Sequence, residues 1–238
     1  MLFKPAGLIF CALKILSPTQ PYPWSNTLKK ILIIGLGDIG RRLARRWRQR
    51  QAQITGLSRS QQTDAAVTQH IVSELDHDLS AISLDTEAAI LYYLAPPANS
   101  GEQDQRLNNL LACIRPTALP ERIIYISTSG VYGDHRGGLV DEDTAPNPQN
   151  ARSVRRLAAE HAVQDWSRQH AVDSVILRVG GIYGPGRLPI ERLQAGMTVL
   201  RHDLAPPTNR IHADDLAGVM NDKPVFNSGR TGSQLAVN

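Results

Sequence analysis

Cysteine is scarce in this chain of 238 residues. The two cysteines, Cys11 and Cys113, lie far apart and match no spacing of metal ligands. Disulfide frameworks and structural zinc sites both need several cysteines or histidines at short, regular spacings. We therefore expect a reduced, cytoplasmic protein that holds no metal ion.

Long hydrophobic runs are also missing. No apolar segment is long enough to span a bilayer, so we expect no membrane partner. The early apolar stretch 7–16 is interrupted by Lys14, and the following SPTQPYPWSN has no small-residue cleavage site of a signal peptide. We predict that residues 1–28 are a disordered, linker-like extension, or that they reflect a start codon assigned too far upstream.

The net charge of +4 comes from one segment. RRLARRWRQR (41–50) holds six arginines, and removing them turns the net charge to −2. Such a cluster could bind anions, but Leu43, Ala44 and Trp47 form a buried stripe at helical spacing, so we favour a solvated helix face. No zinc finger, RNP signature or helix-turn-helix pattern supports a nucleic-acid partner.

Short apolar runs alternate with helical segments from Lys29 onward. Helical patterns cover 39–50, about 102–115 and 152–169. The apolar runs are 31–35, 52–58, 88–95, 122–128 and 174–180. They are almost continuously apolar, as expected for strands covered on both faces. The pattern predicts an α/β protein with a doubly wound parallel sheet.

The first strand runs into GLGDIG (35–40) and then into an amphipathic helix. A G-x-G-x-x-G pattern in this context is typical of dinucleotide-binding sites. Gly35 permits the tight turn, Gly37 lets the backbone approach the diphosphate, and Gly40 allows close packing of the helix on the strand. We assign these glycines, with Asp38 and Ile39 between them, to the cofactor.

The end of the second predicted strand lacks an acidic residue. NAD sites usually place Asp or Glu there to bind the ribose 2′-hydroxyl. This chain has GLSRS (56–60), in which Ser58, Arg59 and Ser60 suit a 2′-phosphate, with Arg59 as the charge partner. NADP is therefore favoured over NAD. From strand order alone, we expect Leu94, Ala95 and Pro96 to border the cofactor, and Glu74 or Asp76 to lie near the adenine.

Three phrases follow in order: STSGVYGD (127–134), LRVGGIYGPGR (177–187) and NRIHADDLA (209–217). Together they resemble the extended short-chain dehydrogenase/reductase superfamily, in its NAD-dependent epimerase/dehydratase branch, from about Lys30 to Met220. The resemblance implies a Rossmann-type domain at 29–180 and a smaller substrate lobe at 181–238. It implies that the Thr128 hydroxyl binds the reacting oxygen of the substrate, and that Gly180, Gly181 and Ile182 lie against the nicotinamide. It also implies a homodimer.

The family carries a Tyr-x-x-x-Lys pair on its catalytic helix, followed by a short apolar run and Glu. Aligning LAAE (157–160) with that run places Arg152 at the tyrosine and Arg156 at the lysine. Arginine stays protonated and cannot act as the general acid or base. We expect Arg156 to bind ribose hydroxyls and Arg152 to clamp an anionic group. His212 and Asp134 are weak alternatives for proton transfer.

These observations leave three hypotheses open. The favoured one is an NAD(P)-dependent oxidoreductase or epimerase-like enzyme of the atypical type, acting on a small polar or sugar-like molecule. The second is a sensor that binds NADP(H) without turnover, which the missing tyrosine and a short or truncated substrate lobe favour. The weakest is an anion- or nucleic-acid-binding protein that uses the arginines of 41–50.

Overall fold

The computed structural model describes residues 28–77, 79, 82–199, 201, 208–221 and 233–237. Apart from Leu28, the predicted extension 1–28 lies outside the described residues. In the described part, no helix has the length and apolar character needed to cross a membrane.

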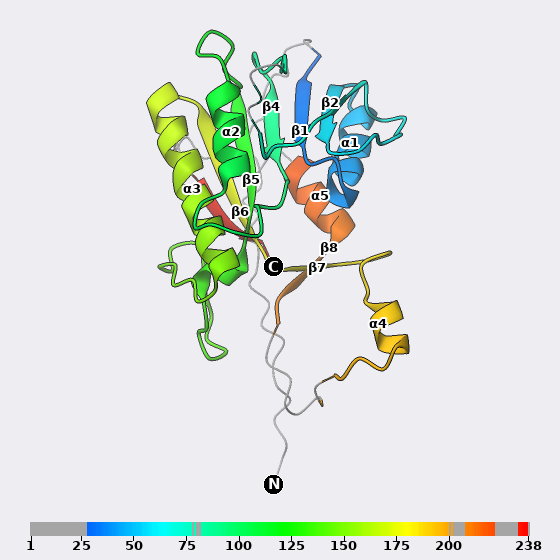
Figure 1. Cartoon of the computed structure of the whole chain (residues 1–238), viewed down its shortest axis with the longest axis vertical. Coiled ribbons are helices and arrows are strands. Elements are labelled where there is room, and N and C mark those ends of the chain that lie inside the picture. The colour runs from blue at the N-terminus through cyan, green and yellow to red at the C-terminus, as the bar shows by residue number, and fades with distance from the viewer. Residues whose placement is uncertain are drawn as a thin grey trace, which may run out of the picture.

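Seven parallel strands form the central sheet, in the order β3-β2-β1-β4-β5-β6-β9 (Figure 1). The strands are β1 (Lys30–Ile34), β2 (Gln53–Ser58), β3 (Gln69–Val72), β4 (Ile90–Tyr93), β5 (Arg122–Thr128), β6 (Asp173–Val179) and β9 (Ser233–Val237). The strand order reverses between β1 and β4. In open parallel sheets, ligands bind at this point, beyond the carboxyl ends of the strands.

Helices cover both faces of the sheet (Figure 1). On one face lie α1 (Asp38–Gln49) and α5 (Ala213–Asn221), whose apolar side chains share a core with Ile33 and Tyr92. On the other face lie α2 (Gln105–Cys113) and α3 (Ala151–His170), which share a second core with Leu91 and Tyr93. Adjacent residues of β4 thus enter opposite cores, as the two-residue period of a strand requires. The predicted doubly wound α/β fold is confirmed.

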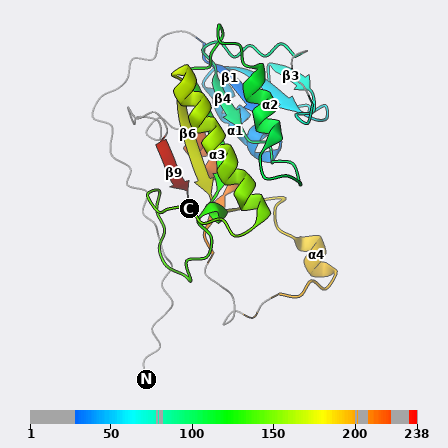
Figure 2. The same cartoon turned by 60° about the vertical axis from the view of Figure 1, so that its left-hand side comes forward.

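A smaller unit follows β6. Strand β7 (Gly181–Tyr183) pairs in parallel with β8 (Arg210–His212), and the segment between them carries the short helix α4 (Ile190–Gln194). Figures 1 and 2 show α4 standing apart from the sheet and its helices, and none of its residues is buried. After β8 the chain returns to the sheet through α5, whose first turn carries Asp214 and Asp215.

Each predicted strand and helix is present to within a few residues, but the structure adds β3, β7, β8, β9, α4 and α5, which were not predicted. Strand β3 was not predicted, because QHIV at the sheet edge is short, half polar and incompletely buried. The helix predicted at about 102–115 begins at Gln105, because the Asp104 carboxylate accepts a hydrogen bond from the backbone N–H of Leu107 and caps the helix there.

Candidate dinucleotide-binding and active site

The turn between β1 and α1 has the geometry that the glycine pattern requires. Gly35 has φ +96°, and a Cβ there would lie 2.7 Å from the backbone nitrogen of Ala95. A Cβ on Gly40 would lie 2.8 Å from the carbonyl oxygen of Gly35. A Cβ on Gly37 would meet nothing within 4 Å. The first and third glycines therefore allow tight packing, and the backbone at Gly37 faces open space at the start of α1, where a diphosphate fits.

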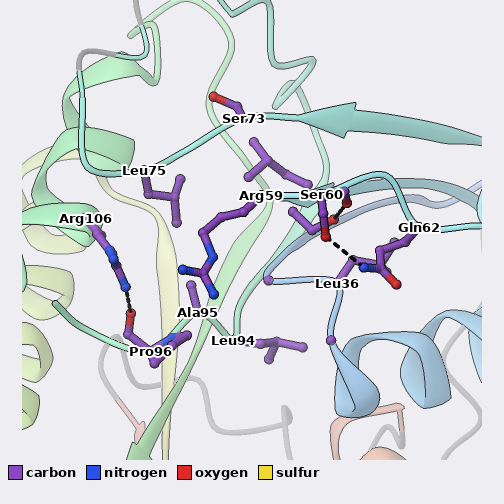
Figure 3. Close-up of a pocket in the computed structure, with 14 residues that line it drawn as sticks. Leu36, Arg59, Ser60, Gln62, Ser73, Leu75, Leu94, Ala95, Pro96 and Arg106 are labelled. Atoms are coloured by element: carbon purple, nitrogen blue, oxygen red, sulfur yellow. Dashed lines mark hydrogen bonds between the residues drawn. The ribbon is translucent and has the colours of Figure 1, made fainter. Parts of the chain in front are cut away.

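A pocket of about 270 Å³ extends from this turn to the end of β2 (Figure 3). Its lining includes seven of the residues that the sequence assigns to the cofactor: Gly35, Gly37, Ser58, Arg59, Leu94, Ala95 and Pro96. It also includes Ser60, which the sequence placed beside the 2′-phosphate, and six residues that the sequence did not indicate: Leu36, Leu57, Gln62, Ser73, Leu75 and Arg106. The chain thus brings the end of β2 and the loop after β4 to the same cavity as the glycine turn.

Arg59 and Ser58 differ in how they meet this pocket. The Ser58 hydroxyl donates to the carbonyl oxygen of Ser60 at 2.9 Å and lies 2.8 Å from Nε2 of His70. Arg59 is exposed, and its side chain extends into the pocket toward Ala95 (Figure 3). Ser58 is therefore held by the protein, and the Arg59 guanidinium is presented to the cavity.

A second arginine borders the pocket. Arg106 of α2 donates from Nε and Nη2 to the two carboxylate oxygens of Asp76, at 2.6 and 2.8 Å, and from Nη1 to the carbonyl oxygen of Pro96 at 3.1 Å. These hydrogen bonds hold the pKa of Asp76 below its usual range. The sequence places Glu74 or Asp76 near the adenine but indicates no role for Arg106, because 30 residues separate Arg106 from Asp76.

The other residues assigned to the cofactor lie outside this pocket. Ile39 belongs to the first turn of α1, and its side chain is buried in the core. Gly180 precedes β7, and a Cβ there would lie 3.0 Å from the carbonyl oxygen of Asn209. Gly181 and Ile182 belong to β7 and pair with Arg210 and Ile211 of β8.

Thr128 ends β5 and caps the 3₁₀ turn Ser129–Tyr132. Its hydroxyl oxygen accepts a hydrogen bond from the backbone N–H of Gly130 at 3.2 Å. This contact uses a lone pair and leaves the hydroxyl hydrogen able to donate. A Cβ on Gly130 would lie 2.9 Å from the hydroxyl of Ser153, so the first turn of α3 packs directly against this turn.

A buried ion pair lies behind Thr128. Arg178 of β6 donates from Nη2 to the Glu160 carboxylate of α3 at 2.8 Å, and both side chains are at most 2% exposed. The Ser127 hydroxyl donates to the same carboxylate, and the Arg178 guanidinium lies 4.9 Å from the ring centroid of Tyr132. This cluster joins α3 and β6 to the end of β5 and so fixes the backbone that carries Thr128.

The arginines at the start of α3 have separate environments. Asn150 caps the helix by accepting a hydrogen bond from the backbone N–H of Ser153. Arg155 donates to the carbonyl oxygen of Gly101 at 2.9 Å. Arg156 is 7% exposed. It donates to the Tyr125 hydroxyl at 3.1 Å and to the carbonyl oxygen of Ile126 at 3.0 Å.

Arg152 is exposed. The predicted pair of arginines on one face therefore consists of a buried residue held by β5 and a solvent-facing one. Charge-assisted hydrogen bonds to carbonyl groups offset the unfavourable place of Arg155 and Arg156 near the positive end of the helix.

The two weak candidates for proton transfer are engaged elsewhere. Nδ1 of His212 accepts a hydrogen bond from the backbone N–H of Asp214 at 3.3 Å, and its ring makes an edge contact with Tyr183. The Asp134 carboxylate accepts a hydrogen bond from the backbone N–H of Arg136 at 2.7 Å. Among the described residues, neither side chain forms a hydrogen bond with Thr128.

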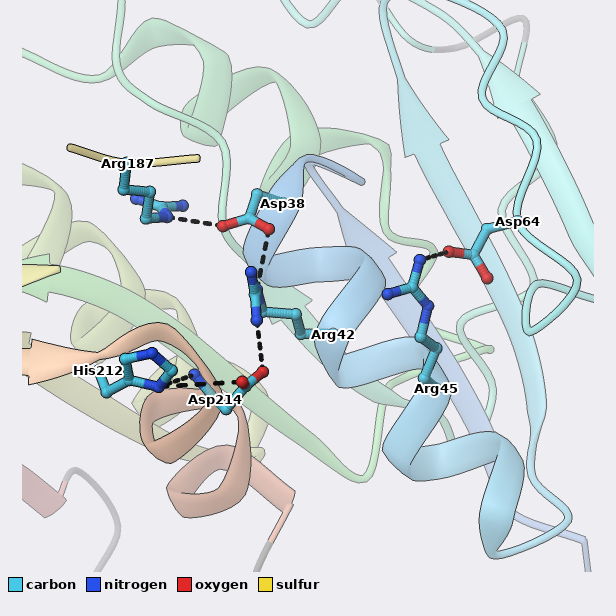
Figure 4. A network of polar contacts seen from close by, with 7 residues as sticks. All are labelled: Asp38, Arg42, Arg45, Asp64, Arg187, His212 and Asp214. Carbon is cyan, nitrogen blue, oxygen red and sulfur yellow. Dashed lines mark hydrogen bonds and ion pairs between the residues drawn. The ribbon is translucent and has the colours of Figure 1, made fainter. Parts of the chain in front are cut away.

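An ionic bridge links the start of α1 to the C-terminal part of the chain (Figure 4). Asp38 accepts hydrogen bonds from Nε of Arg187 at 2.6 Å and from Nε of Arg42 at 2.9 Å. Arg42 also donates to the Asp214 carboxylate of α5 at 2.5 Å. Burial raises the pKa of Asp38, but the two arginines lower it by more, so that it lies below its usual value. We call Arg187, Asp38, Arg42 and Asp214 the ionic bridge.

Five of the six arginines at 41–50 bind polar groups within the protein. The hydrogen bonds run from Arg41 to Gln62, from Arg42 to Asp38 and Asp214, from Arg45 to Asp64, from Arg46 to the carbonyl of Asp214, and from Arg50 to the carbonyl of Asn221. The sequence indicated a solvated helix face, but most arginines on it donate hydrogen bonds within the protein. Residues of α5 and residues after β2 supply most of the acceptors.

The chain is similar to a known protein family and to several known proteins. Residues 31–221 match the model of the NAD dependent epimerase/dehydratase family. Protein YeeZ of Escherichia coli K12 is 33% identical over 208 residues, which span 81% of this chain and 72% of YeeZ. A solved structure from Methylobacillus flagellatus, described as a candidate NAD-dependent epimerase/dehydratase, is 30% identical with a TM-score of 0.64, over 89% of this chain and 76% of that one.

The fold extends to more distant structures. UDP-glucuronic acid 4-epimerase from Bacillus cereus, solved in complex with NAD, is 21% identical with a TM-score of 0.66, over 87% of this chain and 76% of that one. At this identity the likeness concerns the fold alone. The family match covers most of the chain and includes both the glycine turn and the residues around Thr128, so the protein belongs to the NAD-dependent epimerase/dehydratase family.

Proposed function

We propose that the protein binds NADP(H) and acts as an oxidoreductase or epimerase-like enzyme of the atypical extended short-chain dehydrogenase type. The substrate class is a small polar or sugar-like molecule. The observation that carries the proposal is the pocket that runs from the open backbone at Gly37 to the guanidinium of Arg59.

Preference for NADP rests on charge at the end of β2. Arg59 is exposed and lines the pocket together with Ser60 and Gln62, whereas no residue from 56 to 62 is acidic. A guanidinium suits a 2′-phosphate, and an acidic residue would suit a free 2′-hydroxyl. The distant relative from Bacillus cereus was solved with NAD, so cofactor choice in this chain depends on its own residues.

The chemistry follows from the residues near the end of β5. When bound, the nicotinamide supplies hydride transfer. The Thr128 hydroxyl donates a hydrogen bond to the reacting oxygen of the substrate, since its own acceptor contact with Gly130 leaves the hydrogen available. Exposed Arg152 binds an anionic group of the substrate. Arg156, whose guanidinium donates to the Tyr125 hydroxyl, lies on the side of the site that binds the nicotinamide ribose. Water or a further residue carries the proton.

A second candidate function is a sensor that binds NADP(H) without turnover. The positions aligned with the family's tyrosine and lysine are Arg152 and Arg156. Among the described residues, the Thr128 hydroxyl accepts a hydrogen bond from a backbone N–H and contacts no titratable side chain through a hydrogen bond. A hydroxyl without a base behind it supports binding better than proton transfer.

The first experiment is a calorimetric titration of the purified protein with NADPH and with NADH, followed by turnover assays over a broad panel of carbonyl compounds. The enzyme proposal expects tight NADPH binding and NADPH-dependent turnover. Thr128→Ala should abolish that turnover and leave NADPH affinity nearly unchanged, while Thr128→Ser, which keeps the hydroxyl, retains most of it. NADPH binding with no turnover on any compound supports the sensor instead. If neither dinucleotide binds, both candidates are refuted.

A further inference from the structure

Arg187 reaches the phosphate-binding turn from a distant part of the chain. It follows β7 within the C-terminal unit, and its Nε donates to the Asp38 carboxylate at 2.6 Å across 149 residues of sequence (Figure 4). Asp38 is the first residue of α1 and follows Gly37 directly. The Arg187 guanidinium is therefore held at the amino end of the helix that faces the diphosphate in this family.

The guanidinium is held in a way that leaves most of its donors available. Its Nε carries the hydrogen bond to Asp38, and the structure gives its two Nη groups no partner among the described residues. The side chain is 28% exposed, so these groups are open to solvent or to a ligand. Two Nη groups in a rigid plane match pairs of phosphate oxygens.

Charge at this turn also requires a cation. A carboxylate in the first turn of the phosphate-binding helix would repel a diphosphate at the same place. Arg42 divides its hydrogen bonds between Asp38 and Asp214, so its charge is already balanced by α5. Among the described residues, Arg187 forms an ion pair with Asp38 alone, so it is the cation that remains to offset Asp38 and to meet an incoming anion.

The position fits the path of the pocket. Figure 3 shows the cavity running from Arg59 to the glycine turn, where Gly37 is part of its lining. The backbone at Gly37 faces open space, and the next residue along the chain is the one that holds Arg187. A dinucleotide with its adenosine end at Arg59 therefore brings its diphosphate to the turn where Arg187 is held.

We propose that Arg187 binds the diphosphate of the dinucleotide and that Asp38 is the residue that positions it. This inference rests on the proposed NADP(H) binding and adds to it a cofactor contact from the C-terminal unit. It follows that dinucleotide binding ties the segment after β7 to the Rossmann domain. In this scheme Arg59 recognises the 2′-phosphate and Arg187 the diphosphate, so their substitutions should affect different ligands.

The test is a set of titrations with NADPH, NADH and adenosine 2′-phosphate, which carries the 2′-phosphate and lacks the diphosphate. Arg187→Gln should weaken both dinucleotides at least tenfold and change the affinity for adenosine 2′-phosphate by less than twofold. Arg187→Lys keeps the charge but lacks the planar pair of Nη donors, so its affinity for the dinucleotides should lie between those of the wild type and Arg187→Gln. Arg192→Gln, an exposed arginine of α4 in the same segment, is the matched control and should bind like the wild type.

The role of Asp38 is tested by a double substitution. If Asp38 positions Arg187, the loss caused by Arg187→Gln should drop to threefold or less when Asp38→Asn is already present. Thermal melting of each variant shows that it is folded. Wild-type binding of NADPH together with unchanged binding by Arg187→Gln would overturn this inference and leave the proposed function standing. An equal loss for adenosine 2′-phosphate would also overturn it. Failure of the wild type to bind either dinucleotide would refute the proposed function and this inference with it.

Discussion

Two neighbouring tyrosines of β4, Tyr92 and Tyr93, differ in whether their buried hydroxyl groups form hydrogen bonds. The Tyr92 hydroxyl accepts from Nε1 of Trp47 at 3.1 Å and donates to the carbonyl oxygen of Met220 at 2.9 Å. It joins α1 to the end of α5. The Tyr93 hydroxyl is buried on the opposite face and has no hydrogen-bond partner among the described residues. Burial raises the pKa of both phenols, so both stay protonated.

This contrast predicts that the same substitution, Tyr to Phe, affects stability differently at the two positions. Tyr92→Phe should lower the free energy of unfolding by about 1–3 kcal/mol, because it leaves the Trp47 and Met220 groups without their partner. Tyr93→Phe removes a hydroxyl that bonds nothing and keeps the ring packing against Tyr125, so stability should be unchanged or slightly higher. Urea unfolding of the two variants beside the wild type measures the difference. Equal losses in both would contradict the assigned hydrogen bonds.

Cofactor choice is also decided at the residue scale. Arg59→Ala should weaken NADPH binding by about 10–100-fold, the worth of a charge-assisted hydrogen bond, and leave NADH within a factor of about two. Parallel titrations with the two cofactors check this. Arg48→Ala, an exposed arginine on α1, serves as the control for a lost surface charge. Equal effects of Arg59→Ala on both cofactors would show that Arg59 does not meet a 2′-phosphate.

At the scale of elements, the buried pair of Glu160 and Arg178 fastens α3 to the sheet. Both side chains are almost fully buried, and Ser127 adds a hydrogen bond from β5. Arg178→Met alone should lower the free energy of unfolding by about 3–5 kcal/mol, because it leaves a carboxylate buried without its cation. The double variant with Glu160→Gln should lose less, since no charge remains to be buried. Urea unfolding tests both, and a double variant as unstable as the sum of the singles would argue that the two residues act independently.

The elements that the sequence predicted well are those with strong local patterns. Strands β1, β4, β5 and β6 are largely apolar because both of their faces are covered, and the glycine turn lies between one such strand and an amphipathic helix. Strand β3, with its polar half-exposed residues, has no such pattern. Strand β7 follows no strand pattern in the sequence, and only its pairing with β8, some thirty residues later, makes it a strand.

The candidate site was predicted in part for the same reason. Residues that belong to a motif, such as Gly35 and Arg59, could be found from local sequence. Arg106 and Arg187 could not, because their partners Asp76 and Asp38 lie 30 and 149 residues away. A charged residue on a helix or loop looks solvated until the fold brings its partner near. The direction of Arg156, which points to β5, depended likewise on contacts some thirty residues distant.

Across the whole molecule, α1 holds two parts of the C-terminal region, the segment after β7 and helix α5, while β9 pairs with β6 in the sheet. The ionic bridge runs from the segment after β7 through Asp38 and Arg42 to α5, and Arg46 and Arg50 bind carbonyl groups of α5 (Figure 4). The basic helix that raises the net charge thus serves as the surface on which α5 and the segment after β7 are held. The helix that carries the phosphate-binding turn is therefore also the one that holds the C-terminal unit.

This attachment should depend on pH in a defined direction. Burial raises the pKa of Asp38, but Arg187 and Arg42 together hold it below the unfolded value of about 3.9. A carboxyl group with a lowered pKa in the folded protein contributes stability above the unfolded pKa, and the contribution is lost as the pH falls through the folded pKa. The bridge should thus be fully effective at neutral pH and weaken below pH of about 4.

Asp38→Asn tests this at the level of the whole fold. The variant should unfold at lower urea concentration than the wild type near neutral pH, and the difference should shrink as the pH falls below about 4, where the wild-type carboxylate takes up a proton. Added salt should shrink it as well, because the bridge is partly exposed. Asp143→Asn, an exposed loop substitution, is the control and should follow the wild type at every pH. A difference for Asp38→Asn that stays constant from pH 7 to pH 3 would mean that Asp38 stabilises the protein through packing rather than through its charge.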